Sequence, residues 1–158
     1  MNWLDFGVDN CSIARTLDVV GERWTLLVLR EAFNGVRRFD DVCEHIGISR
    51  GILTQRLSTL VEHGILERAP YQESGKRTRY EYRLTPKGRD LFPILVALLG
   101  WGDRYLADPA GPPVLLEHRD CGGQVQVGLH CAGGHRVTGP REVVVRPGPS
   151  AQLAPKLP

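Results

Sequence analysis

The chain lacks a long hydrophobic run. Its most apolar stretch, FPILVALL, contains Pro93 and is far shorter than the roughly 20 residues that a membrane-spanning helix requires. The first residues also lack the charged segment followed by an apolar one that is typical of a signal peptide. We therefore expect a cytoplasmic protein that has no membrane partner.

Cysteine is scarce. Only four of the 158 residues are cysteines, namely Cys11, Cys43, Cys121 and Cys131. This is too few for the disulfide framework of a small secreted protein. In a reducing compartment we expect these side chains to be free thiols, metal ligands or redox sensors.

The sequence motifs of common enzyme classes are missing as well. The chain has no Gly-rich phosphate loop, no nucleophile elbow and no paired carboxylates that suggest an acid–base site. A small thiol or metal enzyme built on Cys121 and His135 is an alternative, but it needs a pocket that such a short C-terminal segment can hardly enclose. The sequence therefore predicts a protein that is not an enzyme.

Positive charge, by contrast, is concentrated in one segment. The formal net charge is only +2, yet the stretch from Arg68 to Arg89 holds seven basic residues against two acidic ones. Clustered basic residues create a local positive potential whatever the net charge of the chain. Such a patch is typical of proteins that contact the phosphates of nucleic acids.

Four short helices are expected before this basic segment. Periodic apolar residues and terminal glycines predict helices over residues 12–20, 22–33, 39–46 and 49–63. The first helix is expected to be capped by Ser12 or Asn10, and the fourth by Ser49. Only a tight turn at Gly47 separates the third helix from the fourth, and such a turn is typical of a helix-turn-helix.

The basic segment itself alternates as β-strands do. Strands are predicted over residues 65–71 and 79–84 with a turn at 73–76, so that a wing over residues 71–84 follows the fourth helix. A long helix over residues 86–106 is expected next, with Thr85 as its cap. Its apolar content exceeds what one face of a small domain requires, and we therefore expect a partner helix from a second copy of the chain.

A segment rich in Pro and Gly, residues 108–113, separates this plan from the C-terminus. Beyond it, short strands are expected at 114–117, 124–129 and 142–145. The predicted fold is mainly α with a small β-wing, a winged helix-turn-helix, plus a small β-rich C-terminal appendage. Its expected parts are a DNA-binding and dimerisation domain at 1–108, an accessory tail at 114–146 and a disordered end at 147–158.

Several motifs resemble those of the HxlR-type winged-helix regulators of bacteria. After Cys11 and its short helix come GERWTLLVLRE at 21–31, GVRRFDDV at 35–42, GISRGILTQRLSTLVEHGILER at 47–68 and YEYRLTPKGRDL at 80–91. The resemblance spans residues 11–106 and implies a homodimeric DNA-binding transcription factor whose dimer interface uses the terminal helices. The tail lies outside it, and the wing departs from the family by an additional Gly-Lys-Arg-Thr segment.

Candidate DNA contacts lie on the fourth helix, on the wing and just before the third helix. Gln55 can pair bidentately with adenine and Arg50 with guanine, whereas the basic residues of the wing are phosphate contacts by type. The predicted DNA-binding residues are Arg37, Arg38, Ser49, Arg50, Gly51, Thr54, Gln55, Ser58, Lys76, Arg77 and Arg79. For Arg37 and Arg38, an ion pair with Asp40 or Asp41 is the alternative.

The cysteines suggest two further sites. Cys11 lies at the start of a helix, where the partial positive charge favours the reactive thiolate, and this predicts a redox sensor. The alternative is a small buried apolar residue. In the tail, His118, Cys121, Cys131 and His135 could close a tetrahedral zinc site, and the alternative is a glycine-rich hairpin with incidental thiols.

The leading hypothesis is therefore a sequence-specific transcriptional regulator, most often a repressor, that binds double-stranded DNA as a homodimer. It requires no cofactor, and its candidate effector is a small molecule or an oxidant. A winged helix that contacts only proteins is the competing class. The basic wing argues against it, because a protein contact does not require a local excess of positive charge.

Overall fold

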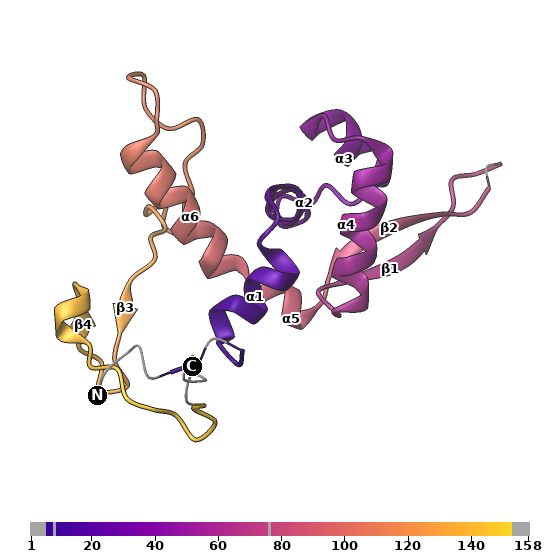
Figure 1. The fold of residues 1–158 in the computed structure, drawn as a ribbon. Helices are drawn as coiled ribbons and strands as arrows, with labels where there is room; N and C mark the ends of the chain where they lie inside the picture. Colours follow the sequence, from indigo (N-terminus) through magenta and orange to yellow (C-terminus); the bar gives the residue numbers. More distant parts are fainter. Residues whose placement is uncertain (1–5, 8, 76, 153–158) are drawn as a thin grey trace. The chain divides into compact units, whose positions relative to one another are not determined.

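The computed structural model describes residues 6–7, 9–75 and 77–152 (Figure 1). The chain divides into two compact units, Met1–Asp90 with Arg146–Pro158, and Leu91–Val145. The first unit holds α1 (Ser12–Val20), α2 (Arg23–Phe33), α3 (Phe39–Ile46), α4 (Arg50–Glu62), β1 (Leu66–Tyr71), β2 (Arg79–Leu84) and α5 (Pro86–Arg89). The second holds α6 (Phe92–Tyr105), β3 (Leu129–His130), β4 (Arg136–Val137) and a 3-10 turn, η2 (Pro140–Glu142).

The core of the first unit lies between α2, α4 and the start of the wing. Leu29 of α2 and Leu53 and Leu60 of α4 are almost fully buried, and so is Leu66 of β1. The apolar positions of α4 recur every three to four residues, so they share the face that packs against α2 and β1. Ile52, which the sequence also places on this face, is exposed.

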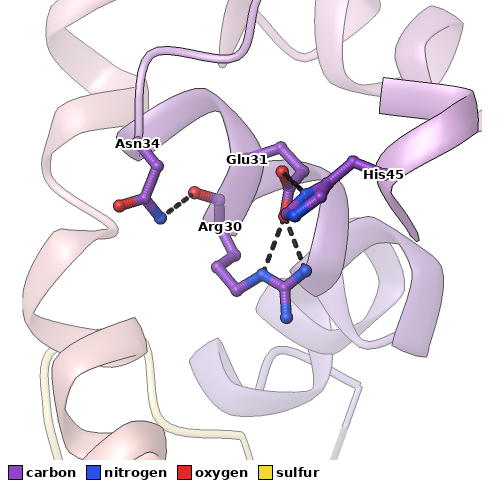
Figure 2. A network of polar contacts seen from close by, with 4 residues as sticks. All are labelled: Arg30, Glu31, Asn34 and His45. Carbon is purple, nitrogen blue, oxygen red and sulfur yellow. Dashed lines mark hydrogen bonds and ion pairs between the residues drawn. The ribbon is translucent and has the colours of Figure 1, made fainter. Parts of the chain in front are cut away.

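The buried face of α2 carries a charged residue. Glu31 is 1% exposed, and Arg30 donates to its Oε1 from Nε at 2.8 Å and from Nη2 at 2.6 Å. Nδ1 of His45 lies 2.6 Å from Oε2 of the same carboxylate (Figure 2). Because a buried carboxylate is costly unless it is paired, these contacts explain why Glu31 is tolerated in the core, and they link α2 to α3.

The two wing strands pair antiparallel, from Leu66 opposite Leu84 to Tyr71 opposite Arg79. Arg38 adds an isolated bridge to Glu81, and the Tyr82 N–H donates to the carbonyl of Arg37 at 2.9 Å. The segment before α3 therefore lies along β2 and holds the wing to the helix-turn-helix.

The prediction of one long helix over residues 86–106 is wrong, because this stretch forms two helices, α5 and α6. Asp90 and Leu91 form a turn between α5 and α6. Pro93 explains the interruption: it is the second residue of α6, and proline fits the first turn of a helix but not its interior. Thr85 caps α5 as expected, and its hydroxyl accepts from the Gly88 N–H at 3.0 Å.

The expected cap of α1 also differs. The N-cap residue is Cys11, which makes no capping hydrogen bond with its side chain. The side chain of Asn10 donates instead to the carbonyl of Ser150. Ser150 lies in the C-terminal segment, of which residues 147–152 are described, and the Gly7 N–H donates to the Gln152 carbonyl there.

The second unit contains less regular structure than the sequence predicts. The strand expected at 114–117 is represented only by the bridge from Glu117 to Gln124, and Glu142 lies in a 3-10 turn. The only regular strand pair among the described tail residues is two residues long, Leu129–His130 with Arg136–Val137. Short bridges of this kind bury little apolar surface, which explains why most tail residues are exposed. No described helix has the length and apolar character to cross a membrane.

Candidate nucleic-acid interface

The turn between α3 and α4 has the geometry of a helix-turn-helix. Gly47 ends α3 with φ of 66°, a left-handed conformation that glycine adopts without steric cost. Ser49 then caps α4, and its Oγ accepts from the Ile52 N–H at 3.3 Å. Ile48, between them, is buried and anchors the turn in the core.

The outer face of α4 is polar and short-chained. Gly51, Thr54, Gln55 and Ser58 are all exposed, as the sequence predicts. Thr54 donates to the carbonyl of Arg50 at 2.8 Å, so its hydroxyl is held close to the helix. A Cβ atom on Gly51 would meet nothing within 4 Å, so the start of this face is open to a second molecule.

The β1 strand of the wing packs against α4 (Figure 1). Arg77 and Arg79 are exposed, whereas Lys76 lies outside the described residues. Arg38 stacks over the Tyr71 ring at 4.6 Å, and its Nη1 donates to Glu73 at 2.9 Å. The ion pair considered for Arg38 is therefore made with Glu73 and not with Asp40 or Asp41. Arg37 is exposed, and its carbonyl accepts from the wing.

One carboxylate connects α4 to the wing. Asp40, in the first turn of α3, accepts a hydrogen bond from Arg50 Nη1 at 2.6 Å, and its other oxygen lies 3.6 Å from Arg79 Nη1. The hydrogen bond from Arg50 holds the pKa of this carboxyl below its ordinary value. Sequence reasoning missed this role, because an acidic residue in the first turn of a helix is common and is explained by the helix dipole alone.

The candidate redox sensor and the candidate metal ligands are not part of the proposed DNA-binding surface. Cys11 is half-buried at the start of α1. In the tail, Cys121 Sγ lies 3.3 Å from His118 Nδ1, and Cys131 Sγ lies 3.4 Å from His135 Nδ1. The structure thus forms two separate Cys–His pairs, and among the described residues no three potential ligands come together to hold an ion. The zinc site stays a prediction that this arrangement does not support.

A tight helix-turn-helix followed by a two-stranded basic wing defines the class of winged helix-turn-helix proteins. Residues 19–109 match the HxlR-like helix-turn-helix family. The HTH-type transcriptional regulator Rv3095 of Mycobacterium tuberculosis is 50% identical over 146 residues, which is 90% of each chain. This chain belongs to the HxlR-like helix-turn-helix family, and it is a helix-turn-helix transcriptional regulator by that membership.

Solved structures agree with this assignment. PA1607, described as a transcription factor, aligns with a TM-score of 0.77 and 40% identity over 87% of this chain and 95% of its own. The redox regulator HypR in its reduced form aligns with a TM-score of 0.52 and 30% identity, over 58% of this chain and 90% of its own. The predicted fold class, mainly α with a small β-wing, is confirmed.

Proposed function

We propose that this protein binds specific sites in double-stranded DNA as a homodimer and represses transcription in the cytoplasm. In this proposal α4 enters the major groove and the wing contacts the backbone. The observation that carries it is the exposed polar face of α4, which holds Gln55, a residue type that can bond a base edge, with Arg50 exposed at the start of the same helix.

Side-chain chemistry indicates which of these residues contact bases and which contact phosphates. Gln55 and Arg50 are suited to base edges, because an amide or a guanidinium can make two parallel hydrogen bonds to one base. Thr54 and Ser58 are short and suit either base edges or phosphates. We propose that the other candidate residues contact phosphates and set the register on the duplex. They are Ser49 and the basic residues Arg37, Arg38, Lys76, Arg77 and Arg79.

A salt titration tests whether DNA is the partner. We expect the affinity of the purified protein for a random-sequence duplex to fall steeply as salt rises, with a log–log slope of about −0.9 for each phosphate contacted. Filter binding from low to physiological salt measures that slope. Failure to bind duplex at low salt, or an affinity indifferent to salt, would support the alternative of a winged helix that contacts only proteins.

Exposed apolar stripes on two helices support the homodimer. On α6, Ile94, Leu98, Trp101 and Tyr105 follow one helical face, and each is at least 44% exposed. On α1, Ile13 and Leu17 are one turn apart and are also exposed. We expect light scattering at micromolar concentration to give the mass of two chains, since two half-sites require two recognition helices. A monomeric mass would contradict this part of the proposal.

A second candidate function is a response to oxidants through Cys11. Its half-buried thiol at the start of α1 is the observation that favours it, and HypR, a relative in structure, is a redox regulator. Oxidation there would add bulk beside an exposed apolar stripe that we assign to the dimer. The response would then change the spacing of the two recognition helices.

We expect Cys11→Ser to abolish any loss of DNA affinity caused by peroxide, without changing the affinity in reductant. Cys121→Ser removes an exposed thiol in the other unit and serves as the matched control, which should still respond. Filter binding with and without peroxide measures both variants. Wild-type protein that keeps its full affinity after peroxide treatment would remove this candidate function.

The division into domains also remains a proposal. We place the DNA-binding and dimerisation part at residues 1–108 and treat 114–146 as an accessory tail. The bridge between Asp108 and Gly111 marks a turn at that boundary, and Gly111 has φ of 102°. The boundary between the two compact units lies earlier in the chain, after Asp90. We therefore propose that α6 takes part in dimerisation and not in DNA contact.

A further inference from the structure

Asp40 contacts two of the proposed DNA-binding residues at once. One carboxylate oxygen bonds Arg50 at the start of α4, and the other lies near Arg79 at the start of β2. All three side chains are more than half exposed, so none of these contacts is needed to satisfy a buried charge. Exposed ion pairs add little to folding stability. The helix dipole explains an acidic residue in the first turn of α3, but folding stability does not explain why this carboxylate also contacts two cations of this surface.

The geometry at Arg50 leaves part of its guanidinium available. Asp40 accepts from Nη1, and the guanidinium lies 4.7 Å from the centre of the Phe39 ring. A guanidinium has five N–H donors in a planar fork, so those on Nη2 and Nε remain for a second partner. Two donors on one edge of the fork match the O6 and N7 acceptors of guanine in the major groove. Carboxylate and ring together limit the directions that this edge can take.

A carboxylate at this position also opposes binding to any DNA backbone. Phosphates compete with Asp40 for Arg50 and Arg79, and the carboxylate itself is repelled by a polyanion. On random DNA the exchange of one anionic partner for another gains little. On a site with a correctly placed guanine, Arg50 can keep its bond to Asp40 and add two bonds to the base.

We propose that Asp40 is a specificity-determining residue: it holds Arg50 for a guanine edge and lowers the attraction of Arg50 and Arg79 to random phosphates. This inference rests on the proposed DNA-binding function and deepens it. It assigns a purpose to an acidic residue in a basic surface. It also predicts that removing the charge makes binding to random DNA tighter and less selective.

The test replaces the carboxylate with an amide of the same size. We expect Asp40→Asn to bind a random-sequence duplex more tightly at low salt, with a salt slope steeper by about one unit for each of Arg50 and Arg79 that gains a phosphate. A duplex selected by the wild-type protein from a random pool supplies the specific site. The ratio of random to selected dissociation constants should fall about tenfold, within the range that a bidentate base contact contributes.

Asp41→Asn is the matched control. It removes the same charge from the same turn of α3, and in the described part of the chain no ion pair joins Asp41 to another residue. This variant should keep the ratio of the wild type. In an Arg50→Ala background, Asp40→Asn should no longer change the ratio. Circular dichroism and a thermal midpoint confirm that each variant is folded.

The outcomes separate this inference from the function on which it rests. If Asp40→Asn and Asp41→Asn change both dissociation constants equally, Asp40 acts only through net charge and the inference is overturned. The same holds if Asp40→Asn leaves random binding unchanged. If the wild type does not bind duplex DNA at low salt, the proposed function itself fails.

Discussion

Replacing Leu53 with alanine is expected to lower the free energy of unfolding by about 2–5 kcal/mol. Leu53 is 0% exposed and lies on the face of α4 that packs against α2 and β1. The substitution removes buried methyl groups and leaves a cavity that the surrounding helices can fill only in part. Because α4 also carries the candidate DNA-reading face, a loss of this size would weaken DNA binding by reducing the folded population.

Ile52→Ala is the control for this prediction. Ile52 is the neighbouring residue on the same helix, but it is 39% exposed, so less apolar surface is lost and no closed cavity forms. We expect its cost to be clearly smaller, about 1 kcal/mol or less. Urea unfolding followed by circular dichroism measures both variants. Equal costs for the two substitutions would mean that the packing of α4 differs from the one described.

Gln55→Ala is expected to weaken binding to a selected duplex by about 1–3 kcal/mol, or roughly 5- to 150-fold, while binding to a random duplex barely changes. The Gln55 side chain is exposed on the outer face of α4, where its only described partner is Arg56, at 3.2 Å. An alanine there removes two possible hydrogen bonds to a base edge and leaves every candidate phosphate contact in place.

Arg77→Ala is expected to behave differently. Arg77 is exposed on the wing, and a phosphate contact carries no sequence information. Its loss should weaken the selected and the random duplex alike and make the salt slope shallower by about one unit. Gln126→Ala, an exposed glutamine of the tail, should change neither. If Gln55→Ala and Arg77→Ala gave the same pattern, the division into base reader and phosphate contact would be wrong.

The order of elements in the winged helix was predictable because its signals are local. The expected bounds of α3 and β2 agree with the structure, and Ser49 caps α4 as expected. Gly47 ends α3 in a left-handed conformation that other residues adopt only at a steric cost. Each of these features depends on a few neighbouring residues, so the sequence alone contains the information.

The candidate interface was predictable in its residue types but not in its contacts. Periodicity places Gln55 and Ser58 on the outer face of α4, and both are exposed. The same reasoning named an ion pair of Arg38 with Asp40 or Asp41 as the alternative to a phosphate contact, whereas Arg38 bonds Glu73. Which residues far apart in the chain pair with each other depends on how the wing lies against α3. No local sequence pattern indicates this arrangement.

The sequence by itself therefore determined the family, the helix-turn-helix and the polar face of α4. Tertiary structure decided the burial of Glu31, which is stable only because Arg30 and His45 reach the same carboxylate. It also decided the position of Asp40 between Arg50 and Arg79, which lie on different elements. The physical reason is the same in both cases: a charged group takes its role from the partners that folding brings within a few ångströms, and some of these, such as His45 for Glu31 and Arg79 for Asp40, lie on other elements of the chain.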